Sequence, residues 1–272
     1  MISAILNYPF MQQAFLAALL ASVICGIMGT IIVEKQMVSL SSGIAHASFG
    51  GIGAGYFLGI EPIIGGFVFA IITSLSVNKI QKKTGANTGT IVSMFWSAGM
   101  ALGILFIFVT PGYPPDMTSY LFGDILAVNK TYLWIILAVT IVVVLAIFSY
   151  FNYWKLYLFD EEYAEIMGIK TKAFEIVLYV LVALSVVILI KVVGIILSIA
   201  LLSIPPAISR LFTDKLINMM LLSGIIGVIF NISGLTVSYY LNIPSGASII
   251  LVGTGFYFLS LLGKKIFTRT IE

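Results

Sequence analysis

Long apolar runs, each close to the length needed to cross a lipid bilayer, recur along almost the whole of this chain. Short segments between them hold most of the charged and turn-forming residues. Of the 272 residues, 60% are hydrophobic and 9% are charged, whereas soluble domains carry about 25% charged residues. Because no water-soluble packing could hide so much apolar surface, the sequence predicts an all-α polytopic membrane protein.

The apolar runs predict about nine transmembrane helices, and eight if the shortest runs do not cross the bilayer. We expect one transmembrane domain that includes the whole chain, residues 1–272. The expected spans are 11–33, 38–58, 63–79, 90–109, 131–150, 175–190, 193–210, 216–240 and 246–263.

The positions of Lys and Arg predict the orientation in the membrane, because these residues concentrate in cytoplasmic loops. If the N-terminus lies outside and nine helices alternate, every basic residue except Lys130 and Lys191 falls in an inner segment. We therefore expect a multi-pass protein of the plasma or inner cell membrane, with the N-terminus outside and the C-terminus in the cytoplasm.

The stretch 37–59 is long enough to span a bilayer but is rich in Ser and Gly, and it contains His46, the only histidine. Ser42, His46, Gly50 and Gly53 recur at helical spacing and share one face. Ionisable groups inside a membrane usually face a cavity or a partner, so this face is a candidate substrate pathway. The alternative is a structural histidine whose ring is hydrogen-bonded to a backbone carbonyl.

If His46 contacts the substrate, neutral imidazole suits zinc, copper, iron or nickel better than calcium or magnesium. One histidine per chain cannot form a closed metal site. A second copy related by a two-fold axis along the pore would bring in a second imidazole. Such a site would hold the ion transiently, as transport requires.

Two features predict how the helices meet. Gly51, Gly55 and Gly59 form GxxxG steps that allow another backbone to approach closely. Pro205 and Pro206 should kink or break the seventh span.

The segment 152–175, NYWKLYLFDEEYAEIMGIKTKAFE, is the longest and most charged inner loop. It predicts a short amphipathic helix with Asp160, Glu161 and Glu162 in its first turn, where acids suit the helix dipole, and with Gly168 at its end. A solvated loop is the alternative to a docking helix for a cytoplasmic partner. The chain has no GxxxxGK[ST] motif, so any ATP hydrolysis must occur on another subunit. We expect a transport subunit rather than an enzyme.

Four blocks of sequence resemble the membrane permease subunits of zinc, manganese and iron ABC importers: 32–59, 119–128, 158–175, and 192–214 together with 234–252. The last block also resembles the wider group of siderophore and cobalamin permeases. The resemblance implies a type II ABC importer-like fold. It also implies a pore subunit that imports a divalent transition metal by alternating access at a homodimer interface.

The resemblance further implies the partners: a second copy of the chain, two cytoplasmic ATPase subunits that bind ATP and Mg²⁺, and an extracytoplasmic metal-binding protein. It implies no nucleic-acid partner and no cofactor bound by this chain, with the metal as substrate. The residues of the implied ATPase-coupling region are Asp160, Glu161, Glu162, Glu165 and Gly168.

One position departs from the family pattern, which usually reads Asp-x-x-x-His in the second helix. His46 matches the histidine, but Ser42 stands where the aspartate is expected, so the pore would lose a negative charge from each copy. A permease for a metal chelate or a cobalamin-like cofactor is therefore one alternative. An ion-coupled secondary transporter is another, although it would need several intramembrane acids or histidines, which this chain nearly lacks.

Overall fold

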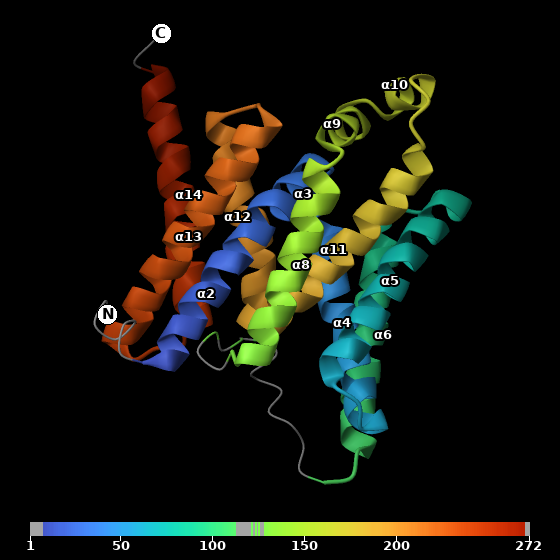
Figure 1. Ribbon diagram of the computed structural model, residues 1–272, viewed down its shortest axis with the longest axis vertical. Helices are drawn as coiled ribbons and strands as arrows, with labels where there is room; N and C mark the ends of the chain where they lie inside the picture. Colours follow the sequence, from blue (N-terminus) through green and yellow to red (C-terminus); the bar gives the residue numbers. More distant parts are fainter. Residues whose placement is uncertain (1–7, 113–120, 122, 124, 126–127, 270–272) are drawn as a thin grey trace.

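A computed structural model describes residues 8–112, 121, 123, 125 and 128–269, with side chains described as far as Lys264. Most of the family-like block 119–128 lies outside these residues. Within the described residues the chain is helical and contains no strands, which confirms the predicted all-α class. The long helices stand side by side in one bundle (Figure 1).

Nine long helices occur among the described residues. The first is continuous through α2 (Pro9–Ile24), the π-helix η1 (Cys25–Gly29) and α3 (Thr30–Glu34). The others are α4 (Val38–Leu58), α5 (Pro62–Thr84), α6 (Thr88–Val109), α8 (Lys130–Phe148), α11 (Thr171–Val193), α12 (Ile195–Phe212), α13 (Leu216–Leu241) and α14 (Ser245–Arg269).

Eight of these helices are long and apolar enough to cross a membrane. The exception is α4, which has 21 residues but a lower hydropathy because Ser, Gly and His46 replace bulky apolar side chains. It is nevertheless extensively buried in the bundle, against α5 and α6. The predicted eight or nine helices are therefore confirmed, but the uncertain span is α4, because of its low hydropathy, and not one of the shortest apolar runs.

Successive long helices alternate in direction, so successive connections between them lie at opposite ends of the bundle (Figure 1). Two short helices, α9 (Phe151–Phe159) and α10 (Glu161–Ile166), lie at the same end as the C-terminus. We call this end the α10 end. Among the described residues, every Lys and Arg except Lys130 and Lys191 belongs to helix ends or connections at the α10 end.

The first long helix and α11 are the most deeply buried of the candidate spans, and α8 and α14 are the least buried. Small residues let the buried helices approach one another. A Cβ at Gly26 in η1 would lie only 2.8 Å from the backbone nitrogen of Gly224 in α13. The centre of the bundle therefore depends on close backbone contact as well as on side-chain packing.

Helix α12 continues through Pro205 and Pro206, so of the expected kink or break the break is wrong, and the kink stays a prediction. Both prolines are buried, and a Cβ at Gly29 would lie 2.8 Å from Pro206 Cγ. Pro205 and Pro206 leave the carbonyls of Leu201 and Leu202 without their usual backbone donors, and the Leu202 oxygen faces Gly29, where a Cβ would lie 2.7 Å from it. Buried membrane helices tolerate proline where neighbouring helices pack against the freed carbonyls.

The predicted close approach at the GxxxG steps is confirmed for two of the three glycines. A Cβ at Gly51 would clash with the carbonyl oxygen of Gly65 in α5, and a Cβ at Gly55 would lie 2.7 Å from Pro62 Cα. A Cβ at Gly59 would meet no atom within 4 Å, and this glycine instead ends α4 with a φ of +68°. Glycine is favoured there because the left-handed conformation strains other residues.

Candidate functional site

His46 lies near the middle of α4 and is half-buried. Its Nδ1 lies 2.9 Å from the carbonyl oxygen of Ser42, one turn earlier. Because a carbonyl oxygen can only accept a hydrogen bond, Nδ1 must carry the proton. In the neutral ring, Nε2 therefore keeps a lone pair that can bind a cation.

The second contact of His46 comes from α6. The indole of Trp96 stacks on the imidazole with 4.2 Å between ring centroids and 28° between the ring planes. Trp96 is 41% exposed, so the pair lies at the surface of the single chain rather than in its core. The hydrogen bond and the stack together fix the orientation of the only imidazole in the protein.

Trp96 was missed by sequence reasoning. Its contact with His46 depends on which face of α6 meets α4, and that face is set by glycines on both helices. A Cβ at Gly50 would lie 2.8 Å from the carbonyl oxygen of Gly99, and a Cβ at Gly53 would lie 2.5 Å from that of Gly103. The GxxxG spacing of Gly99 and Gly103 was the available signal, because it marks the packed face of α6.

The structure separates the four residues that were expected to share a pathway face. Ser42 and His46 are half-buried, whereas Gly50 and Gly53 are buried against the backbone of α6. The two glycines therefore pack helices in this chain, and their place on a substrate pathway stays a prediction. Ser42 contributes its backbone carbonyl to His46, and the place of its hydroxyl on a substrate pathway stays a prediction.

No group of three His, Cys, Asp or Glu side chains that could hold a metal ion occurs in the part of the chain that the structure describes. Within one chain, His46 could therefore supply only a single imidazole to an ion. Its bond to a backbone carbonyl is also what a purely structural histidine would make. That bond uses only one of the two ring nitrogens, so the geometry permits a ligand role.

The segment between α8 and α11 contains the amphipathic helix that the sequence predicts, and this is α10. The Oδ1 atom of Asp160 accepts a hydrogen bond from the backbone N–H of Tyr163 at 2.9 Å, so Asp160 caps the helix rather than lying in its first turn. Glu161 and Glu162 occupy the first turn. Gly168 follows the helix with a φ of +78°, as expected for a glycine at the C-terminal end.

The surface of α10 combines acids with exposed apolar side chains. Ile166 is 82% exposed and Met167 is 60% exposed, and both lie beyond the candidate membrane spans. The Glu165 carboxylate accepts a hydrogen bond from the Thr171 hydroxyl at 2.8 Å, which ties α10 to the start of α11. Exposed apolar residues outside the membrane are typical of a surface that binds another protein.

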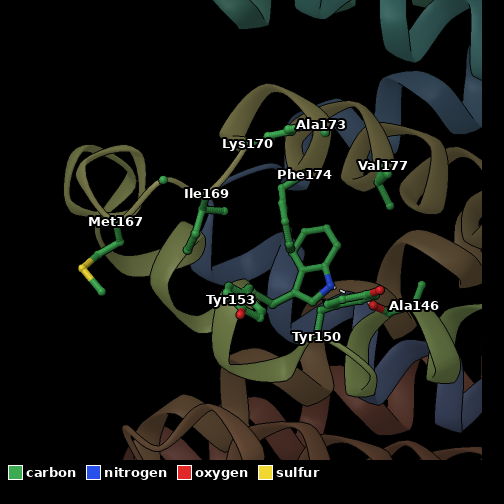
Figure 2. Close-up of a pocket in the computed structure, with 11 residues that line it drawn as sticks. Ala146, Tyr150, Tyr153, Met167, Ile169, Lys170, Ala173, Phe174 and Val177 are labelled. Carbon is green, nitrogen blue, oxygen red and sulfur yellow. Dashed lines mark hydrogen bonds between the residues drawn. The ribbon is translucent and has the colours of Figure 1, made fainter.

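A cavity of about 620 Å³ lies beside this segment, between the end of α8, α9 and the start of α11. Figure 2 shows Phe174 and Val177 projecting toward Tyr150 and Tyr153 across this space. The indole Nε1 of Trp154 donates a hydrogen bond to the carbonyl of Ala146 at 2.8 Å, which anchors α9 to the end of α8. The short helix α9 is therefore fixed to the bundle, and α10 extends from it.

Comparison with known proteins decides the family. The model of the ABC 3 transport family matches residues 7–264 of this chain. The chain belongs to that family. It is therefore a membrane-spanning transport subunit, and the predicted resemblance to permease subunits of ABC metal importers is confirmed.

Relatives of this family member align over almost its full length. An uncharacterized membrane protein of Synechocystis is 38% identical over 260 residues, covering 96% of this chain and 92% of the relative. The manganese transport system membrane protein MntC of Halalkalibacterium halodurans is 32% identical over 256 residues, covering 94% and 88%. In a solved structure of PsaBC from Streptococcus pneumoniae with a Fab, one chain is 30% identical with a TM-score of 0.86, covering 95% of this chain and 93% of that chain.

Proposed function

We propose that this chain is the pore-forming permease of an ATP-driven importer for a divalent transition metal, with manganese as the first candidate. The observation that carries the proposal is the full-length similarity to a manganese transport membrane protein at 32% identity. The polar helix α4 supports it, because α4 presents an oriented imidazole among helices that are otherwise apolar. Zinc and iron are the other ions to be compared.

The α10 end of the bundle is the proposed cytoplasmic end. Its concentration of Lys and Arg agrees with the rule that basic residues stay on the cytoplasmic side. This orientation places the N-terminus outside and the C-terminus inside. Two ATPase subunits, which would bind ATP and Mg²⁺, would then contact the exposed surface of α10, and an extracytoplasmic metal-binding protein would deliver the ion at the opposite end.

A homodimer explains the exposed position of the His46–Trp96 pair. In a single chain, an imidazole and an indole would lie at the surface of a membrane-embedded bundle, where polar groups are costly. A second copy across a two-fold axis would cover the pair and bring a second His46 to the same pathway. The ion would cross as this shared pathway opens to one side of the membrane at a time. Because Ser42 is uncharged, the pathway of the dimer would have two fewer negative charges than one with the aspartate that the family resemblance implies.

The proposal is tested by the metal content of cells that carry or lack this gene. Cells without it should contain less manganese when manganese is scarce, and the wild-type gene should restore the content. The variant His46→Ala should restore it poorly although it inserts into the membrane in normal amounts. If the gene restores the zinc or iron content of the cells instead of the manganese content, that metal is the substrate. If His46→Ala restores the metal content fully, His46 does not lie on the substrate pathway.

A further inference from the structure

A turn of three residues joins α3 to α4, the helix that carries His46. Lys35, Gln36 and Met37 form this turn, and Gln36 adopts a left-handed φ of 56°. The backbone N–H of Met37 donates to the carbonyl of Ile32 at 2.7 Å, so the turn is closely held. Because α4 begins immediately afterwards, a shift of the backbone at Lys35 would be passed to the first turn of α4.

Lys35 reaches from this turn to both short helices at the α10 end. Its Nζ atom lies 3.8 Å from Oε2 of Glu161 in the first turn of α10. The same atom lies 4.3 Å from the centroid of the Tyr157 ring in α9. The Lys35 side chain is 21% exposed and that of Glu161 is 48% exposed, so solvent screens the ion pair in part, whereas the contact with the Tyr157 ring is more shielded.

Tyr157 is a fixed partner for this lysine. Its ring is buried, and it packs against Trp154 and Phe174 with centroid distances of 6.0 and 6.2 Å. Burial, together with the nearby Glu161 and Glu175 carboxylates, raises the pKa of its phenol, so the ring stays neutral. Lys35 is therefore held between an anchored ring and a partly exposed acid on α10.

The residue before Lys35 is tied to another helix. Oε1 of Glu34 lies 3.4 Å from Nε of Arg210, near the end of α12. Charged contacts from α9, α10 and α12 thus converge on two consecutive residues at the α3–α4 junction. By contrast, α10 packs mainly on α9 and α11, while α4 packs mainly on α5, α6, α11 and α12.

We infer that Lys35 is a positioning residue that transmits movement of α10 to α4, and so links the partner-binding surface to the helix that holds His46. The inference rests on the proposed function, in which α10 contacts an ATPase. A polar link of this kind can change partners as the bundle moves, whereas α11, which touches both α10 and α4, is packed deeply in the core. The competing route runs through α11 and does not need Lys35.

The test uses the complete complex of permease and ATPase in liposomes, with the delivery protein and manganese as substrate. In Lys35→Met, the amount of manganese imported per ATP hydrolysed should fall about tenfold, within the range of coupling free energies between sites. Lys35→Arg keeps the charge and should stay within about twofold of wild type. Lys83→Met is the matched control, because Lys83 is exposed at the end of α5 and forms none of the ion pairs or ring contacts found among the described residues.

A second measurement reports the movement itself. Ser39 is exposed in the first turn of α4, and a Ser39→Cys reporter can be labelled with a membrane-impermeant thiol reagent. With Lys35 present, the labelling rate should differ between ATP-free and ATP-bound complexes. With Lys35→Met, this difference should disappear although ATP is still hydrolysed.

The two proposals fail in different ways. If wild-type complexes import no manganese in response to ATP, the proposed function is wrong. If wild-type complexes import it and Lys35→Met keeps both the wild-type import per ATP and the labelling difference, the inference about Lys35 is wrong and the signal travels through α11. A loss of assembled complex in Lys35→Met but not in Lys35→Arg would also overturn it, because the residue would then serve assembly.

Discussion

At the scale of single residues, the two ring nitrogens of His46 have different tasks. Nδ1 donates to the carbonyl of Ser42, while Nε2 is left with the lone pair, and Trp96 holds one face of the ring. A histidine that is oriented in this way loses little freedom when it binds an ion. The rate of metal uptake should therefore depend on Trp96 as well as on His46.

Replacing Trp96 tests the stacking contact. Trp96→Ala should lower the rate of metal uptake by about two- to tenfold, since an aromatic pair is worth about 0.5–1.5 kcal/mol beyond its buried area. Trp96→Phe keeps a stacking ring and should retain most of the rate. Trp134→Ala on α8 is the control, because Trp134 is 69% exposed and has no ring contact among the described residues. Equal rates for Trp96→Ala and this control would exclude an orienting role.

Restoring the family carboxylate tests the departure at Ser42. Ser42→Asp places an acid one turn from His46, so the purified permease should retain manganese about tenfold more tightly, which corresponds to about 1.4 kcal/mol. Ser39→Asp adds the same charge one turn earlier and should have a smaller effect. Metal retained after dialysis measures the difference. Indifference to Ser42→Asp would mean that this position does not face the ion.

The sequence predicts His46 as a candidate because an imidazole is rare inside a membrane, and Ser42 because it lies one turn away on the same face, where the family resemblance implies an aspartate. It could not predict Trp96, because that contact joins α4 to α6 and is set by the packing of Gly50 and Gly53 on Gly99 and Gly103. Because of the same packing, Gly50 and Gly53 are buried against α6, whereas Ser42 and His46 are half-buried. The residue types were enough to predict candidate residues, whereas the tertiary structure was needed to show which faces of α4 and α6 pack together.

At the scale of helices, close contact between backbones positions α4. Gly51 and Gly65 meet so closely that neither position has room for a Cβ. Gly51→Ala should therefore destabilise the protein by about 1–3 kcal/mol through overpacking, seen as a lower melting temperature in detergent. Gly255→Ala in α14 is the matched control, because a Cβ there meets no atom within 4 Å and alanine favours the helix. An unchanged melting temperature for Gly51→Ala would contradict the close packing of α4 on α5.

Helix positions follow closely from the sequence, because apolar length is a local property. The expected span 216–240 and the observed helix Leu216–Leu241 differ by one residue. Helix α12 shows where local rules fail, since Pro205 and Pro206 lie inside a continuous helix that packs closely on Gly29, a contact that no local pattern reveals. The contacts of Lys35 with α9 and α10 also join distant segments, and only the structure shows them.

At the scale of the whole molecule, the bundle separates two surfaces. The α10 end carries most of the positive charge and an exposed surface on α10, while the His46–Trp96 pair lies along the side of the bundle. Membership of the ABC 3 transport family explains why a chain with no nucleotide-binding motif would need such a surface. We therefore propose a pore that takes its energy from an ATPase partner and whose pathway is completed by a second copy.

The most direct test of this account is manganese uptake by liposomes that contain the chain with or without its ATPase partner, with the delivery protein supplied on the side opposite the ATPase. We predict uptake only when the ATPase and ATP are both present, and a large loss of uptake in His46→Ala complexes that hydrolyse ATP normally. Full uptake by the chain alone, without ATP, would contradict it.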